Sequence, residues 1–163
     1  MSTSVAILGG ATLTHLEDSL IHTLSPLLHR GQKVQTFYRV EINGQVYYSY
    51  LYGRTKKRNS YTVSFTSESD METRKVGQIK KFICLPQSQL PYAVIQILQP
   101  NAIASECFNS DPAVDHLSKF FSVDKTDSLE IVPVTFLLHK CVYIEIEQSI
   151  YIVEIDTDNV ILD

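Results

Sequence analysis

Five histidines offer the first candidates for metal binding or acid–base chemistry. Three of them, His15, His22 and His29, are spaced seven residues apart. On a helix this spacing places neighbouring side chains about 10 Å apart, which is too far for two of them to share one metal ion. We therefore expect solvent-facing or helix-end histidines here and no metal site.

The cysteines and carboxylates likewise form no recognisable catalytic or metal-binding motif. The three cysteines are widely spaced and form no Cys-x-x-Cys pair, so a zinc site or redox motif is not expected. His139 lies close to Cys141, but Cys141 belongs to an apolar strand-like run, whereas a reactive thiol needs an exposed electropositive site. Glu145 and Glu147 alternate as on the solvated edge of a strand. Because no phosphate-binding glycine loop, Gly-x-Ser-x-Gly or His-Glu-x-x-His motif occurs, we predict no catalytic residue, no cofactor and no small-molecule substrate.

Positive charge is concentrated in one part of the chain. Residues 54–81 hold eight of the fourteen Lys and Arg against three acids, a balance of +5, whereas residues 111–163 hold three against eleven, a balance of −8. The basic segment includes a loop flanked by Tyr52 and Tyr61, and cations between aromatic rings suit phosphate contact with base stacking. The candidate contacts for nucleic acid or an acidic partner are Arg54, Lys56, Lys57, Arg58, Arg74, Lys75, Lys80 and Lys81.

Two plainer interpretations of these charges stay open. The loop at residues 54–60 would also suit a solvated turn that keeps an edge strand soluble. The basic and acidic parts of the chain could also neutralise each other in the fold. The same run of Lys and Arg resembles a short nuclear-localisation signal, which predicts a nuclear protein.

Tyrosines crowd the segment between Tyr38 and Tyr52, which holds five of the nine. Because adjacent strand residues point to opposite faces, some of these rings must face outward. An outward group could form an aromatic cage for a methylated lysine of a histone tail, while core packing and cross-strand pairing would account for the others. The candidate aromatic surface consists of Tyr47, Tyr52 and Tyr61.

The elements that carry these residues begin with a helical pattern. Leucines recur at helical spacing over residues 13–28. Thr14 and Glu17 have the spacing of a capping box, and Pro26 should end or kink the helix. We therefore expect residues 1–33 to form a helical segment that packs on the rest of the domain.

A hairpin is predicted at Asn43-Gly44, the strongest short-range turn signal in the chain. A two-residue loop would pair Val40 with Tyr47 and mix the two faces of the hairpin. A three-residue loop that begins at Ile42 would instead pair Val40 with Val46 and gather the apolar and aromatic residues on one face. We expect this second register, with the glycine as a left-handed bulge residue.

Short strands separated by turn signals predict a mainly β domain at residues 34–163, of barrel or sandwich type. Gly77 inside one strand indicates a bulge or the close approach of another backbone, and alternation there places Ile79 and Phe82 on opposite faces. One short inserted helix is expected to open at Asp111-Pro112. The expected strands are 61–65, 76–85, 92–98, 131–134, 140–147 and 150–155, with a polar loop at 66–73.

Several of these segments resemble bromo-adjacent homology (BAH) domains. The similar parts, in order, are Gly77-Gln78-Ile79, Ala93–Leu98, and Val132-Pro133-Val134 followed by Lys140-Cys141-Val142. The resemblance covers roughly residues 34–155. It implies a single-domain BAH-like β-barrel that binds histones or other chromatin proteins, or in some cases nucleic acid.

A second resemblance is to the C-terminal, non-nuclease region encoded by CACTA-type (En/Spm-like) transposons. The similar segments are Tyr48-Ser49-Tyr50-Leu51-Tyr52-Gly53-Arg54, Lys57-Arg58-Asn59-Ser60, Gly77-Gln78-Ile79-Lys80-Lys81-Phe82 and Val132-Pro133-Val134. This resemblance implies a transposon-derived accessory domain. Neither resemblance assigns a ligand-binding residue.

The leading hypothesis is a non-catalytic recognition module inside the cell, in the nucleus, whose partner is a histone or other chromatin protein, or DNA. A membrane location is not expected, because no apolar run reaches the roughly 18 residues that a membrane helix needs. One alternative is a structural assembly domain of a larger transposase complex with no ligand of its own. The other is an enzyme whose site has no recognisable motif, since geometry rather than sequence defines a site.

Overall fold

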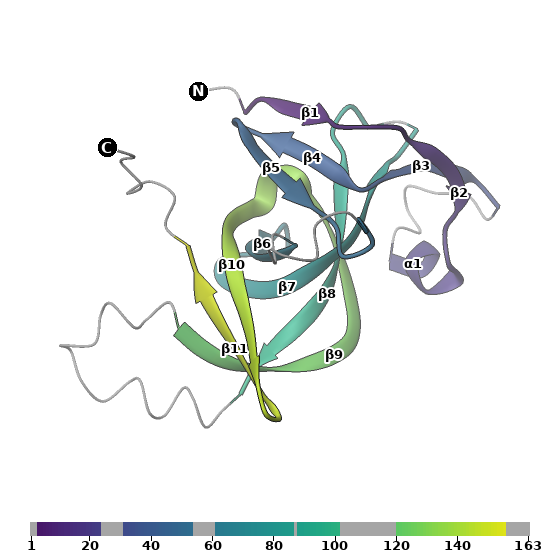
Figure 1. The fold of residues 1–163 in the computed structure, drawn as a ribbon. Helices are drawn as coiled ribbons and strands as arrows, with labels where there is room; N and C mark the ends of the chain where they lie inside the picture. Colours follow the sequence, from purple (N-terminus) through teal and green to yellow (C-terminus); the bar gives the residue numbers. More distant parts are fainter. Residues whose placement is uncertain (1–2, 24–30, 54–60, 87, 102–119, 156–163) are drawn as a thin grey trace.

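The computed structural model describes residues 3–23, 31–53, 61–86, 88–101 and 120–155 (Figure 1). Strands make up most of this part of the chain, so the mainly β prediction is confirmed. The elements are β1 (Val5–Ile7), β2 (Thr12–His15), α1 (Asp18–Thr23), β3 (Lys33–Phe37), β4 (Arg39–Ile42), β5 (Gln45–Tyr48), β6 (Thr62–Ser67), β7 (Asp70–Cys84), β8 (Tyr92–Pro100), β9 (Phe120–Pro133), the 3-10 helix η2 (Val134–Phe136), β10 (Leu137–Ile146) and β11 (Ser149–Glu154).

The described strands divide between two sheets. A small sheet has the order β1-β4-β5, and a large one has the order β2-β3-β7-β6-β10-β11-β9-β8. The large sheet curls, because β7 also pairs with β8, and strands β6 to β11 surround a common interior (Figure 1). The expectation of a single barrel that holds all the strands is therefore wrong, since β1, β4 and β5 form a sheet of their own.

The helical start expected at residues 1–33 is also wrong in most of its length. Strands β1 and β2 lie there, and α1 is only six residues long. Thr14, the expected helix cap, sits in β2, where its hydroxyl oxygen lies 2.6 Å from that of Thr36 on β3. Of the described leucines in this pattern, Leu16 and Leu20 pack in one core cluster, whereas Leu13 is exposed. Pairing with β3 overrode the local helical preference. The short helix expected at 111–112 lies outside the described residues.

The β4–β5 hairpin adopts the register of the two-residue loop and not the expected register of the three-residue loop. Its turn consists of Asn43-Gly44 alone, and both residues have positive φ, 50° and 81°. Such a turn has the twist that paired strands need. Val40 pairs with Tyr47 on the buried face, and Arg39 pairs with Tyr48 on the opposite one. The three-residue loop is therefore wrong: the turn preference decided the register, and the two faces are not mixed.

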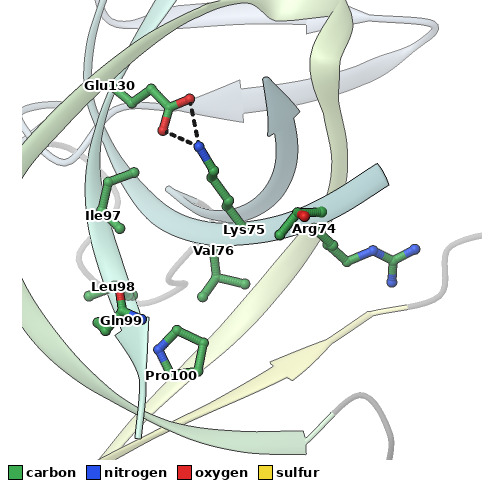
Figure 2. Close-up of a pocket in the computed structure, with 9 residues that line it drawn as sticks. Arg74, Lys75, Val76, Ile97, Leu98, Gln99, Pro100 and Glu130 are labelled. Atoms are coloured by element: carbon green, nitrogen blue, oxygen red, sulfur yellow. Dashed lines mark hydrogen bonds and ion pairs between the residues drawn. The ribbon is translucent and has the colours of Figure 1, made fainter. Parts of the chain in front are cut away.

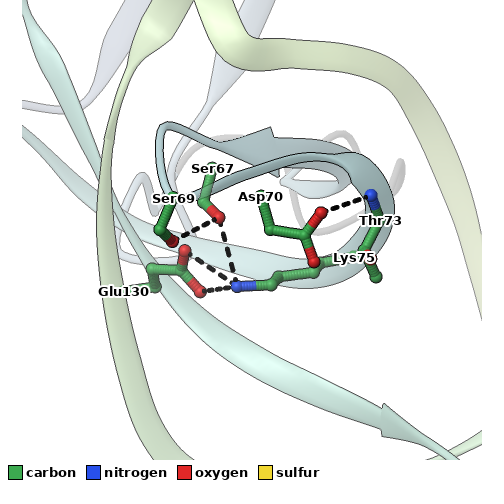
Figure 3. A network of polar contacts seen from close by, with 6 residues as sticks. All are labelled: Ser67, Ser69, Asp70, Thr73, Lys75 and Glu130. Atoms are coloured by element: carbon green, nitrogen blue, oxygen red, sulfur yellow. Dashed lines mark hydrogen bonds and ion pairs between the residues drawn. The ribbon is translucent and has the colours of Figure 1, made fainter.

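The polar loop expected at residues 66–73 is a tight turn instead. Strand β6 ends at Ser67 and β7 begins at Asp70. The backbone N–H of Thr73 donates to Asp70 Oδ1 at 2.9 Å (Figure 3). Hydrogen bonds from Thr73 lower the pKa of the Asp70 carboxyl. Side-chain hydrogen bonds thus allow polar residues to continue the two strands almost to the turn.

A β-bulge changes which side chains of β7 share a face. The pairing of β7 with β8 shifts register between Ile79 and Lys81. Because a bulge inserts one extra residue, the alternation moves by one position. Ile79 and Phe82 therefore both enter the same core cluster, and the prediction that they lie on opposite faces is wrong.

Gly77 lies close against β8. A Cβ added there would contact the side chain of Ile95 and lie 2.6 Å from the carbonyl oxygen of Gln96. The close backbone approach predicted from the sequence is confirmed. Gly77→Ala should lower the free energy of unfolding by about 1–3 kcal/mol, the usual cost of overpacking, as measured by urea denaturation. Gly10→Ala is the control, because a Cβ at Gly10 meets nothing within 4 Å. Equal losses in both variants would contradict this explanation.

Besides the cluster around Leu16 and Leu20, two hydrophobic cores lie on opposite faces of β7 and β8. The larger core packs the small sheet against the large one through residues such as Val40, Tyr47 and Phe82. The second core fills the interior of the curled sheet, with one buried side chain from each of five strands. These are Val76 of β7, Leu98 of β8, Val123 of β9, Cys141 of β10 and Ile152 of β11.

Candidate functional site

The basic side chains singled out in the sequence fall into three groups. Arg54, Lys56, Lys57 and Arg58 lie outside the described residues, so their role stays a prediction. Arg74, Lys75 and Lys81 lie in ion pairs with acids from other segments. Lys80 lines a pocket together with aromatic residues.

The ion pairs join the basic and acidic parts of the sequence. Arg74 Nη1 lies 2.7 Å from Glu154 Oε2, and Lys75 Nζ lies 2.9 Å from Glu130 Oε2 (Figure 3). Both carboxylates belong to the acidic C-terminal third, on β11 and β9. Lys81 Nζ is 3.9 Å from a carboxylate oxygen of Glu17. The charges of Arg74 and Lys75 are therefore neutralised within the fold by carboxylates of the acidic region.

The proposed aromatic surface of Tyr47, Tyr52 and Tyr61 is not one surface. Tyr47 is only 4% exposed and belongs to the larger core, so its assignment to a surface is wrong. It was misplaced because its face follows from the hairpin register. The half-buried ring of Tyr52 packs against Tyr48, with centroids 5.4 Å apart. Tyr61 meets Tyr50 edge to face at 5.2 Å, on the rim of the pocket that contains Lys80.

This pocket, here called the tyrosine–lysine pocket, is the candidate functional site. Its volume is about 230 Å³. Residues of four strands, β7 to β10, meet there with the two segments that flank residues 54–60. The lining residues are Tyr50, Tyr61, Gln78, Lys80, Gln96, Lys125, Tyr143 and Glu145.

Strand alternation places these side chains at one end of the curled interior. On β10, Cys141 is buried in the interior core, and Tyr143 and Glu145 follow at steps of two residues. On β7, Val76 lies in the same core, and Gln78 and Lys80 follow in the same way. Because residues i and i+2 share a face, each strand passes from an apolar centre to a polar rim.

The two tyrosines at the rim are held by the backbone of one residue. The N–H of Tyr50 donates to the carbonyl oxygen of Ile79 at 2.7 Å, and the N–H of Ile79 donates to the carbonyl oxygen of Tyr61 at 2.8 Å. Since Ile79 is fully buried, these bonds hold the main chain of both tyrosines against β7, next to Lys80. The rim is therefore organised by the main chain of β7.

Each lysine of the pocket lies over a tyrosine ring. Lys80 Nζ is 4.5 Å from the ring centroid of Tyr50, and Lys125 Nζ is 5.6 Å from that of Tyr143. Both distances are within the range of cation–π attraction. Tyr50 is 52% exposed, so its ring can still be reached by a planar ligand.

The charges of the pocket favour an anionic ligand. Burial lowers the pKa of Lys80, and the charge of Lys125 lowers it further. The Tyr143 hydroxyl and then the Glu145 carboxylate raise the pKa of Lys125, against the effect of burial. Glu145 Oε2 lies 3.8 Å from Lys125 Nζ. Two ammonium groups thus face one carboxylate among the lining residues.

A second, apolar pocket is lined by residues of β7 and β8 and by Glu130 of β9. It has a volume of about 560 Å³, and Val76, Ile97 and Leu98 form its wall (Figure 2). Lys75 at its edge points to Glu130, and the guanidinium of Arg74 points away from Ile97 and Leu98 (Figure 2). Because both cations are engaged in ion pairs, this pocket offers apolar contact rather than charge recognition.

The described cysteines do not offer a nucleophile. Burial, and then the nearby charge of Glu154, raise the pKa of Cys141 to about 12. Burial also raises the pKa of Cys84. Since the thiolate is the reactive form, both thiols are poorly reactive at neutral pH. No group of three or more His, Cys, Asp or Glu that could hold a metal ion occurs among the described residues.

The comparisons with known proteins give no match. No protein-family model matches the sequence, and neither a curated protein nor a solved structure matches it. The resemblances to BAH domains and to transposon-encoded proteins, together with the nuclear location, therefore stay predictions. In the described part of the chain, no helix has the length and apolar character needed to span a membrane.

The sequence predicted two lining residues of the pocket, Lys80 and Tyr61, as contact residues. It did not predict that Lys125, Tyr143 and Glu145 line the same pocket. Lys125 lies in a stretch whose sequence has no strand pattern, although the structure places it on β9. Tyr143 and Glu145 could have been found from their spacing of two from the buried Cys141. No sequence signal indicates that Lys125 and Lys80 face the same pocket.

Proposed function

We propose that this chain is a non-catalytic recognition module that binds single-stranded nucleic acid at the tyrosine–lysine pocket. The observation that carries the proposal is the pair of lysines that each lie over a tyrosine ring in one pocket. Ammonium groups contact phosphates, and aromatic rings stack on bases whatever the sequence.

A single strand fits this site better than a duplex. A double helix is read by an element that enters a groove, whereas this site is a concave pocket lined by several strands. An unpaired base can be splayed out of its strand and stacked on an aromatic side chain. Tyr50 is the exposed ring in the pocket. In the sequence, the four cations at residues 54–58 stand between Tyr50 and Tyr61, and we expect them to add phosphate contacts.

The charge of the pocket argues against a methylated lysine of a histone tail as its ligand. An aromatic cage attracts a cation through the faces of its rings. Here Lys80 and Lys125 already lie over Tyr50 and Tyr143. A third cation would be repelled by two ammonium groups, and like charges brought together cost free energy. The partner that the charges favour is therefore an anion.

The test is a salt titration of binding to a short labelled single-stranded oligonucleotide, followed by fluorescence anisotropy. Each phosphate contact contributes about −0.7 to the slope of log affinity against log salt concentration. We expect Lys80→Ala and Lys125→Ala each to make the slope shallower by about that amount. Lys33→Ala removes the same charge on β3, away from the pocket, and should leave the slope unchanged. Absence of binding at low salt, or equal slopes in all variants, would contradict the proposal.

A second candidate function is an assembly domain without a ligand of its own. The supporting observation is an apolar stripe on β10, formed by Val142, Ile144 and Ile146, which are 37–56% exposed. They are spaced by multiples of two residues and share a face, and exposed apolar patches of this kind mark interaction surfaces. An oligonucleotide titration without binding, together with self-association that is lost in Ile144→Lys, would favour this function.

A further inference from the structure

One oxygen atom in the tyrosine–lysine pocket faces two donors at once. The Tyr143 hydroxyl donates to Glu145 Oε2 at 3.0 Å, and Lys125 Nζ lies 3.8 Å from the same oxygen. An ammonium group and a phenol bind a phosphate oxygen through the same kind of charge-assisted contact. This Glu145 oxygen therefore lies where a phosphate oxygen would be bound.

The contact of Glu145 with Lys125 is suited to exchange. Their side chains are 54% and 52% exposed, and the two atoms are 3.8 Å apart. Solvated ion pairs of this kind contribute little free energy, about 0.2–1 kcal/mol. Water and an incoming anion can therefore displace the carboxylate at small cost.

Lys80 gives a phosphate an advantage over the carboxylate. It lines the same pocket, and burial and then the charge of Lys125 lower its pKa. A phosphate has oxygens on several sides and can contact both ammonium groups, whereas the ion pair of Glu145 is with Lys125. An anion placed between the lysines would also relieve their mutual repulsion.

We infer that Glu145 occupies the phosphate subsite of the pocket in the free protein, and that a phosphate group of the ligand displaces it to bind Lys125, Tyr143 and Lys80. This inference rests on the proposed function and names the group that enters the pocket. Glu145 is then a residue that limits affinity, and it favours ligands with a phosphate over neutral aromatic compounds.

The experiment compares Glu145→Gln with the wild-type protein in the same oligonucleotide titration. The glutamine keeps the shape of the side chain and removes the competing charge, so affinity should rise about 1.4- to 5-fold, which corresponds to the free energy of an exposed ion pair. Glu147→Gln is the matched control, because it removes the same charge two residues further along and Glu147 does not line the pocket. In a second arm, inorganic phosphate competes with the oligonucleotide at constant ionic strength, with chloride as the reference anion. It should displace the oligonucleotide more effectively than chloride does.

The outcomes separate the inference from the proposed function. A gain confined to Glu145→Gln, with competition by inorganic phosphate, supports the phosphate subsite. If the wild-type protein binds and Glu145→Gln is no tighter, the inference is overturned and the proposed function stands. Equal gains in Glu145→Gln and Glu147→Gln overturn it as well, because the gain then reflects net charge. Competition by phosphate no better than by chloride also overturns it. Absence of oligonucleotide binding in every variant overturns the proposed function together with the inference.

Discussion

Replacing Arg74 with methionine should lower the free energy of unfolding by about 3 kcal/mol, the lower end of the cost of breaking a buried ion pair. Its partner Glu154 sits at the end of β11 with a side chain that is only 3% exposed. The other carboxylate oxygen, Oε1, has no hydrogen-bond partner among the described residues. Without Arg74 the carboxylate would be buried and unpaired. The lower end applies because the side chain of Arg74 is 50% exposed.

The measurement is urea denaturation of Arg74→Met beside Lys75→Met. The Lys75–Glu130 pair is partly exposed on both sides, at 30% and 24%, whereas Glu154 is almost fully buried, so the loss of the Lys75–Glu130 pair should cost only about 1 kcal/mol. The double variant Arg74→Met, Glu154→Leu removes both charges and should recover most of the stability. If Arg74→Met is no less stable than Lys75→Met, the prediction is contradicted, because the buried Glu154 carboxylate then tolerates the loss of its partner.

Replacing Tyr50 with alanine should weaken single-strand binding by about 5- to 150-fold, which corresponds to the loss of about 1–3 kcal/mol of base stacking. Tyr50 is the exposed ring of the tyrosine–lysine pocket, and it also supports Lys80 through the contact at 4.5 Å. Tyr50→Phe keeps the aromatic face and should retain most of the affinity. Anisotropy titrations at one fixed salt concentration measure all three proteins.

Tyr38→Ala is the matched control for this prediction. Tyr38 is also exposed, at 37%, but does not line the pocket. Its replacement should change the affinity little. A loss in Tyr38→Ala as large as that in Tyr50→Ala would show that the strand does not use the pocket. Thermal unfolding of each variant would confirm that the fold is kept.

Local patterns account for the parts of the fold that were predicted correctly. A nearly continuous apolar run predicted the strand at β8, and the glycine inside a strand predicted the close approach of β8 at Gly77. Asn43-Gly44 predicted the β4–β5 turn, but not its register. These signals lie within a few neighbouring residues, so they can be read without knowing which strands pair.

Two of the wrong predictions share one cause, the pairing with a strand that is distant in the sequence. The leucine spacing before residue 28 suits a helix, yet β2 pairs with β3 instead. The bulge between Ile79 and Lys81 is a feature of the pairing with β8, and it brings Ile79 and Phe82 into one core. Pairing with a distant strand can outweigh local preference, and a single sequence does not reveal which partner is available.

The sequence by itself determined that the chain is mainly β, where several strands lie, and that its charge is divided between a basic and an acidic region. Only the tertiary structure decided what those charges do. Arg74 meets Glu154 across 80 residues of sequence, while Lys80 and Lys125 face one pocket from two strands. Whether a cation is neutralised or free to meet a ligand depends on distances of a few ångströms between strands. Those distances are set by strand register and bulges rather than by composition.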